Sequence, residues 1–196
     1  MYRIILFCYI SLVSNIFGQI DTLYFTAVDS VNRLKFSVVG DLMCHGTQLK
    51  YAQVDSISYD FNSSFTKVKP IFDESDIVMG NLETVVAGKE NGYHGYPVFN
   101  TPIDFLTALE YAGFDLLIPA NNHATDQRKE GIVNTALNIK KSNMNYSGTN
   151  ISREDLDSIS IYSVNDLFRA FVHRDRPLKG IEQILEITCE RVDLGC

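Results

Sequence analysis

Residues 101–126 read "TPIDFLTALEYAGFDLLIPANNHATD", in which a helix pattern gives way to a strand pattern and then to a polar cluster. Thr101 suits the N-cap of a helix, and Pro102 suits its first turn because the N–H that proline lacks is not needed there. Gly113 is the residue type that commonly ends a helix. The apolar run at 114–120 is long enough for a strand and too short for a helix. This stretch therefore predicts a helix followed at once by a buried strand.

The same alternation recurs along the first three quarters of the chain. Expected strands cover 22–28, 33–41, 76–81, 114–120 and 144–150, and expected helices cover 61–75, 101–113 and 130–143. Pro70 predicts a kink or a restart within the first of these helices. The central strands are apolar on consecutive residues, as in a sheet covered on both faces. The order predicts an α/β fold with a mostly parallel sheet.

Beyond Asn150 the pattern is weaker. A strand is expected at 158–163, a charged break at 173–180, and a helix at 181–192, where apolar residues recur at helical spacing. We therefore predict one domain over residues 33–150 and a divergent tail over residues 151–196.

The first 18 residues resemble a targeting segment. Arg3 precedes an apolar stretch at 4–17, and Gly18 is a small residue at a suitable cleavage point. These features are typical of a secretory signal peptide over residues 1–18, and the stretch is short and polar for a membrane span. Two alternatives remain open: an uncleaved membrane anchor and an ordinary buried segment. The signal predicts export to the periplasm or cell envelope.

The chain of 196 residues has a net charge of −7, and 45% of its residues are hydrophobic. An acidic chain without a basic stripe gains nothing from a phosphate backbone, so nucleic-acid binding is not expected. Outside the signal, the cysteine spacings fit neither a zinc knuckle nor a disulfide framework. A single bridge between Cys189 and Cys196, or between Cys44 and the tail, is open in an exported protein.

Polar side chains follow three of the expected strands. They are Asp41 after the first, Asn81 and Glu83 after the second, and Asn121, Asn122 and His123 after the third. Because the carboxyl ends of parallel strands meet at one edge of a sheet, these side chains are expected to converge. Carboxylate and amide oxygens suit hard divalent cations, and imidazole adds zinc and iron to the candidates. A bound cation or polar substrate would offset the penalty for desolvating these groups.

Taken singly, each residue has an ordinary structural explanation. Asp41 suits a turn or an N-cap, the asparagines suit turns, Glu83 suits a solvated charge, and His123 suits a loop histidine. Their placement at three successive strand ends favours a shared site. Weaker candidates for that site are Asn81, Asn121 and His45.

At these residues the sequence resembles the CapA-type capsule-synthesis family, which is linked to poly-gamma-glutamate production and has a metallophosphoesterase-like fold. The matching pieces are "FSVVGDLMCHG", "VKPIFDESDIVMGNLET", "PVFNTPIDFLTALEYAGFDLLIPANNHATDQRKEGIVNTALNIKK" and "YSGTN". The resemblance covers roughly residues 34 to 150. It implies a partial metallophosphoesterase-like α/β sandwich, the N-terminal half of the family domain.

The resemblance also implies roles for individual residues. Asp41, Glu83 and Asn122 would hold a divalent metal (Mn, Zn, Fe or Mg), and His123 would be the catalytic residue that polarises or protonates the reacting group. Asn81 stands where phosphoesterases usually carry a bridging Asp, and Met43 where many carry a His. An amide cannot replace the charge of a bridging carboxylate, so one metal is favoured over two.

A further departure concerns the tail. Family members continue into a second half-domain with more His motifs, and no such motif follows Asn150. A truncated or frame-shifted reading of a longer member is expected to look like this, so enzymatic activity stays open.

The primary functional hypothesis is an exported protein of capsule or poly-gamma-glutamate biosynthesis with metal-dependent hydrolase or transferase ancestry. Its partners would be the capsule polymer or its synthesis machinery, in a membrane-associated assembly. The alternatives are a non-catalytic envelope protein that binds polymer or acts as a scaffold, and a generic metallophosphoesterase.

Overall fold

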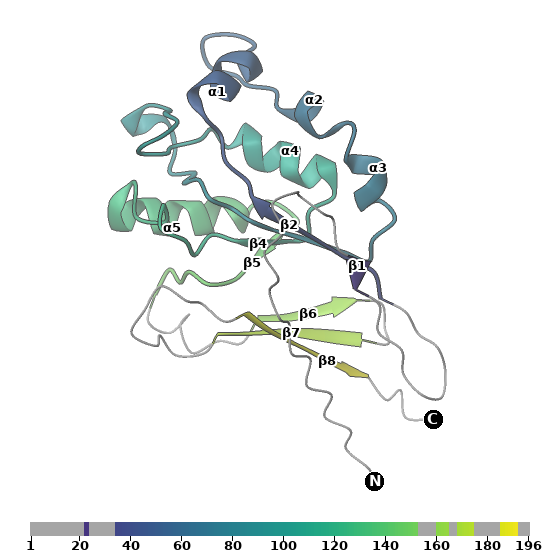
Figure 1. Cartoon of the computed structure of the whole chain (residues 1–196). Helices are drawn as coiled ribbons and strands as arrows, with labels where there is room; N and C mark the ends of the chain where they lie inside the picture. Colours follow the sequence, from purple (N-terminus) through teal and green to yellow (C-terminus); the bar gives the residue numbers. More distant parts are fainter. Residues whose placement is uncertain (1–21, 24–33, 153–159, 165–167, 175–184, 192–196) are drawn as a thin grey trace.

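The computed structural model describes residues 22–23, 34–152, 160–164, 168–174 and 185–191. The signal peptide predicted at residues 1–18 lies outside these ranges. Figure 1 shows a five-stranded sheet with helices on one side and a three-stranded sheet on the other. The predicted α/β class is confirmed.

The larger sheet has the strand order β1-β2-β3-β4-β5. Its strands are β1 (Thr22–Leu23), β2 (Phe36–Asp41), β3 (Ile77–Asn81), β4 (Leu116–Ile118) and β5 (Asn145–Tyr146). Strand β1 pairs antiparallel with β2, and the other neighbours pair in parallel. The mostly parallel sheet follows the predicted order, although most of its strands are shorter than the apolar runs that predicted them.

The helices are α1 (Gly46–Ala52), α2 (Asn62–Phe65), α3 (Lys69–Phe72), α4 (Asp104–Ala112) and α5 (Arg128–Ile139), with a 3-10 turn, η1 (Lys89–Asn91). Helix α4 ends at Gly113, whose φ of 100° is the left-handed conformation that glycine adopts without strain. The helix expected at 61–75 is two short helices, and Pro70 lies in the first turn of the second, where its missing N–H is tolerated.

Helix α1 was not predicted. Its sequence, "GTQLKYA", buries only Leu49 and Ala52, which is too few apolar positions to give a helical pattern. These two residues pack in the central core, and this packing stabilises the short helix.

The core lies between the sheet and the helices. Val78 of β3, Leu117 of β4, and Leu106 and Leu109 of α4 are each at most 1% exposed. Burying such a side chain contributes about 1.5–3 kcal/mol. This packing fixes the strands whose ends carry the candidate residues.

The three-stranded sheet is antiparallel, in the order β6 (Ser160–Val164), β7 (Phe168–Arg174) and β8 (Leu185–Arg191). Strand β6 confirms the strand predicted at 158–163. The helix predicted at 181–192 is wrong over 185–191, where β8 pairs with β7 along its whole length. The sequence "LEITCER" also alternates apolar and polar residues, and pairing between strands decided between the two periods.

None of the helices in the described part of the chain is long and apolar enough to cross a membrane.

Candidate functional site

The carboxyl ends of three parallel strands lie side by side. In the strand register Asp41 is the partner of Asn81, and Asn81 is the partner of Ile118. The register shifts between Val39 and Asp41, so Gly40 forms an irregular step just before the carboxylate. The residues that follow β2, β3 and β4 therefore meet at one edge of the sheet.

Gly80 allows β2 and β3 to reach this edge together. A Cβ atom at Gly80 would lie 2.8 Å from side-chain atoms of Leu42 and Val39, and 3.0 Å from the ring of Phe114. Only a residue without a side chain fits this space unless its neighbours move.

The amide of Asn81 joins the strand ends. Its Nδ2 donates to Asp41 Oδ1 at 2.7 Å and to Glu83 Oε2 at 3.0 Å. Its Oδ1 accepts a hydrogen bond from Asn121 Nδ2 at 3.0 Å, and Asn121 also donates to the carbonyl of Leu82 at 2.9 Å. One side chain therefore connects residues after β2, β3 and β4, and the two carboxylates share its NH₂ group.

The two carboxylates also interact with each other. Burial, followed by hydrogen bonding to Asp41 and charge repulsion from it, raises the pKa of Glu83 above its ordinary value. The charge of His123 and the hydrogen bond from Asn81 act in the opposite direction. Burial and the neighbouring Asp41 therefore both disfavour the ionised form of Glu83.

His123 is held on three sides. Its backbone N–H donates to Asn121 Oδ1 at 3.0 Å, and its Nδ1 lies 2.9 Å from Asp126 Oδ2. Its ring packs edge-on against Phe99, with the centroids 4.7 Å apart. An ionised carboxylate can only accept, so Nδ1 carries the hydrogen in this contact and Nε2 is left for other partners.

Asp126 is a site residue that the sequence interpretation missed. The same Oδ2 that faces His123 also accepts the backbone N–H of Phe99 at 2.7 Å. Its signal was the spacing in "HATD", which places a carboxylate three residues after the imidazole.

Two predicted residues lie apart from this network. Asn122 is exposed and makes no side-chain hydrogen bond among the described residues. His45 is exposed at the N-cap of α1, and its ring contacts Phe99 at a centroid distance of 5.3 Å. His45 therefore reaches the site only through the ring that also supports His123.

Within the described residues, no three His, Cys, Asp or Glu side chains are gathered closely enough to hold a metal ion. Asp41 and Glu83 provide two of the oxygen ligands that hard cations prefer, and a cation would offset the repulsion between them. The donor set thus fits one hard divalent cation completed by amide oxygens or water. It does not fit a closed tetrahedral zinc site, which needs four protein ligands.

Cys44 is fully buried in the main core and free. Burial raises the pKa of its thiol to about 12, against a smaller opposing effect of a hydrogen bond with Thr101. A bridge from Cys44 to the tail is therefore not formed.

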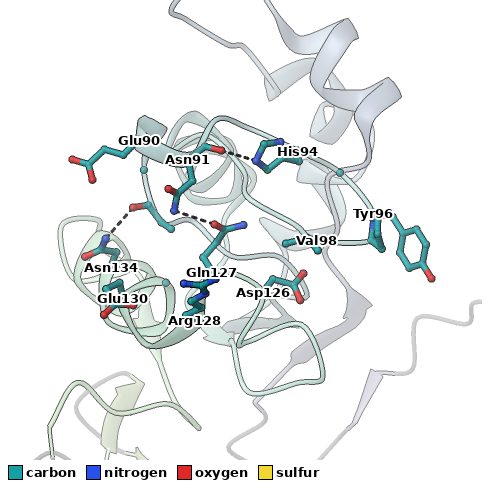
Figure 2. A pocket seen from close by; sticks show the side chains of 15 residues that line it. Glu90, Asn91, His94, Tyr96, Val98, Asp126, Gln127, Arg128, Glu130 and Asn134 are labelled. Carbon is teal, nitrogen blue, oxygen red and sulfur yellow. Dashed lines mark hydrogen bonds between the residues drawn. The ribbon is translucent and has the colours of Figure 1, made fainter.

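A cavity of about 840 Å³ is lined in part by Asp126, the hydrogen-bond partner of His123. Figure 2 shows that one wall is the loop from Ala87 to Val98 and that the other runs from Asp126 into α5. His94 lines it, with Nε2 2.6 Å from the carbonyl oxygen of Asn91. No periodic pattern in the sequence indicated this cavity, because an irregular loop forms half of it.

The mostly parallel α/β sheet, with Gly-Asp, Asn-Leu-Glu and Asn-Asn-His after its strands, is consistent with the metallophosphoesterase-like fold that the family resemblance implies. The sequence model of the bacterial capsule synthesis protein PGA_cap matches residues 35–176, and the chain belongs to this family. The match includes β6 and β7 of the second sheet and β2 to β5 of the larger sheet.

Two curated relatives are similar to this chain. The PGA biosynthesis protein CapA of Bacillus subtilis (strain 168) is 31% identical over 135 residues, which cover 67% of this chain and 34% of that protein. The capsule biosynthesis protein CapA of Bacillus anthracis is 29% identical over 137 residues, covering 68% and 32%. The chain thus spans about a third of the length of these relatives.

Proposed function

We propose that this chain acts in the assembly of a poly-gamma-glutamate capsule, as an exported envelope protein with a metal-dependent hydrolase or transferase site. The names of the two relatives support the capsule role. The observation that carries the site assignment is the Asn81 amide, which joins Asp41, Glu83 and Asn121 beside His123.

In this proposal Asp41 and Glu83 hold a divalent cation, with Mg²⁺ or Mn²⁺ favoured over Zn²⁺ or Fe by the oxygen ligands. When bound, such a cation supplies Lewis acidity toward a carbonyl or phosphoryl oxygen. Asn81 and Asn121 orient the two carboxylates and the His123 loop. Asn122 would bind the cation from the solvent side, because it is exposed and its side chain makes no hydrogen bond with another described residue.

His123 is the group that moves a proton. Asp126 accepts from Nδ1 and fixes the ring, so Nε2 is the atom that can exchange a proton with a substrate. The Phe99 ring excludes water from one side of the imidazole, since it is fully buried and packs edge-on.

One observation favours a non-catalytic alternative. The NH₂ group of Asn81 already lies between the two carboxylates, which is where a cation would be expected. An envelope protein that binds capsule polymer or acts as a scaffold would keep this hydrogen-bonded arrangement without a metal. A generic metallophosphoesterase is the remaining alternative, and it differs only in substrate.

Titration calorimetry with Mn²⁺ tests the metal site. We expect one bound ion for the unsubstituted chain, at least tenfold weaker binding for Asp41→Asn, and little change for His123→Ala. Glu74→Gln is the matched control, because Glu74 is an exposed carboxylate whose one ion pair among the described residues is with Lys35. The absence of binding in the unsubstituted chain would leave the non-catalytic alternative.

Export is tested separately. Cells that make the chain with and without residues 2–18 are fractionated, and the full chain is expected in the envelope or periplasmic fraction. Equal recovery of both forms from the cytoplasm would contradict the proposed location.

A further inference from the structure

The two carboxylates of the candidate site already share a donor group that belongs to the chain itself. Asn81 Nδ2 lies 2.7 Å from Asp41 Oδ1 and 3.0 Å from Glu83 Oε2. A divalent cation that joined the same two oxygens would lie about 2.0–2.6 Å from each of them. The amide nitrogen and such a cation therefore need nearly the same position, and they exclude each other.

The backbone fixes which way the side chain of Asn121 points. The N–H of His123 can only donate, and it lies 3.0 Å from one end of the Asn121 amide. The carbonyl of Leu82 can only accept, and it lies 2.9 Å from the other end. Asn121 must therefore present Oδ1 to His123 and Nδ2 to Leu82.

Asn121 in turn fixes the orientation of Asn81. Its Nδ2 also faces the Asn81 side chain, at a distance of 3.0 Å. A donor needs an acceptor opposite it, so Asn81 turns Oδ1 toward Asn121 and its NH₂ group toward the carboxylates. Through these two side chains, the backbone at His123 ensures that the carboxylates receive a donor rather than a ligand oxygen.

Asn81 cannot become a metal ligand without breaking this chain of amides. Turning its amide over would bring Oδ1 toward the cation, but it would also place the NH₂ groups of Asn81 and Asn121 opposite each other. If Asn121 turned as well, it would lose its hydrogen bonds with the His123 N–H and the Leu82 carbonyl. A cation therefore competes with the NH₂ group of Asn81 and does not recruit its oxygen.

The competition is one that a cation can win. Asp41 and Glu83 lie close enough for a hydrogen bond between them, so ionising both brings two like charges together. An amide has no net charge with which to offset this repulsion, whereas a divalent cation interacts with both charges. The NH₂ group should therefore hold the empty site and give way as the cation concentration rises.

We propose that Asn81 is a built-in competitor for the cation. Its NH₂ group occupies the cation position while the site is empty, Asn121 holds the group in that orientation, and a cation binds only by displacing it. The apparent affinity is then reduced by the fraction of molecules in which the position is taken, so the site loads only at a raised cation concentration. The proposal rests on the proposed function, because it states what controls the loading of the metal site.

Titration calorimetry with Mn²⁺ on the unsubstituted chain and on Asn81→Ala tests the competition. Alanine lacks the competing NH₂ group and leaves both carboxylates in place, so we expect Asn81→Ala to bind Mn²⁺ at least fivefold more tightly. A side chain that ligates the cation, or that only supports the fold, would weaken binding when it is removed. Equal or weaker binding by Asn81→Ala would therefore overturn the proposal.

The matched control for this variant is Asn138→Ala. Asn138 is an amide that donates to a backbone carbonyl elsewhere, that of Val86, and its removal should leave the affinity for Mn²⁺ unchanged. A similar gain in Asn138→Ala would show that loosening the fold is enough to tighten binding, and the proposal would be wrong.

Asn121→Asp tests the orientation of the amides by a different route. Both oxygens of the new carboxylate accept, so the His123 N–H keeps its partner while Asn81 is free to turn its NH₂ group away from the cation position. We expect Asn121→Asp to bind Mn²⁺ at least tenfold more tightly. Thr125→Asp, which adds the same charge at an exposed position of the same turn, should change the affinity less than threefold. Equal gains in both variants would mean that charge alone acts, and the role of Asn121 would be rejected.

The outcomes distinguish this proposal from the proposed function. If Asn81→Ala binds Mn²⁺ and the unsubstituted chain does not, the competitor is supported and a metal-dependent role of the unsubstituted chain is rejected. If the unsubstituted chain binds Mn²⁺ and Asn81→Ala binds no more tightly, the metal site stands and the competitor is rejected. If neither binds, the carboxylates are not a cation site and both proposals are wrong.

Discussion

The two halves of the candidate site differ in how completely the chain builds them. The imidazole half (Phe99, His123 and Asp126) is packed and hydrogen-bonded without any ligand. The carboxylate half (Asp41, Asn81 and Glu83) places two like charges on one shared amide. The imidazole half should therefore contribute to stability, and the carboxylate half should reduce it until a cation or other partner is bound.

Phe99→Ala is expected to have the largest effect, because it empties the centre of the imidazole half. Phe99 is fully buried and contacts the rings of His45 and His123. Truncating a buried Phe costs about 3–5 kcal/mol. Urea unfolding followed by circular dichroism measures the loss, and Phe99→Leu, which keeps most of the volume, should lose much less. A loss below about 1 kcal/mol for Phe99→Ala would show that this half is not a packed unit.

Asp126→Ala should have the next largest effect. It leaves the buried N–H of Phe99 without its acceptor, which costs about 1–3 kcal/mol. It also frees His123 Nδ1, so long-range proton–nitrogen NMR of the imidazole should show a change in which ring nitrogen carries the hydrogen. Asp126→Asn keeps an oxygen acceptor and is expected to lose less stability. An unchanged imidazole spectrum in Asp126→Ala would contradict a positioning role.

These two halves were not equally predictable from the sequence. The convergence of Asp41, Asn81 and Asn121 followed from apolar runs that end in polar residues, because parallel strands align their carboxyl ends. The role of Phe99 could not be predicted, because it lies in an irregular loop. In the sequence, Asp126 was marked only by its spacing of three residues from His123. Its hydrogen bond with the imidazole depends on the turn that follows β4.

The same limits apply to the fold. The stop signal at Gly113 predicted the end of α4 to the residue, whereas the expected N-cap at Thr101 was wrong because the helix begins at Asp104 after Ile103. Strand β8 was predicted as a helix because its apolar residues fit both periods, and only its pairing with β7 distinguishes them. The sequence of one segment does not show which distant strand it will pair with.

Arg128→Gly tests the strained end of the cavity wall. The left-handed φ of Arg128 is free of strain only for glycine, so Arg128→Gly should be more stable than Arg128→Ala by about 0.5–1 kcal/mol. Both variants lose the same guanidinium, which isolates the backbone effect. Urea midpoints measure the difference, and a less stable glycine variant would indicate that helix propensity outweighs the strain at this position.

The smallest expected effect has the opposite sign and concerns the carboxylate half. The folded state raises the pKa of Glu83, so the protonated group favours folding and the ionised group opposes it. Its stabilising contribution is complete below the pKa of an unfolded Glu and is lost as the pH rises through the higher folded value. Glu83→Gln removes this dependence.

We therefore expect the variant to gain stability over the unsubstituted chain between about pH 4 and pH 7, by less than about 1 kcal/mol because the group is partly solvated. Thermal melts at both pH values in a chelator measure the gain. Added Mn²⁺ should cancel or reverse it, since a cation stabilises the ionised pair only in the unsubstituted chain. A variant that is less stable at both pH values, with and without Mn²⁺, would show that the carboxylates are already satisfied by Asn81 and that the two halves do not differ in the proposed way.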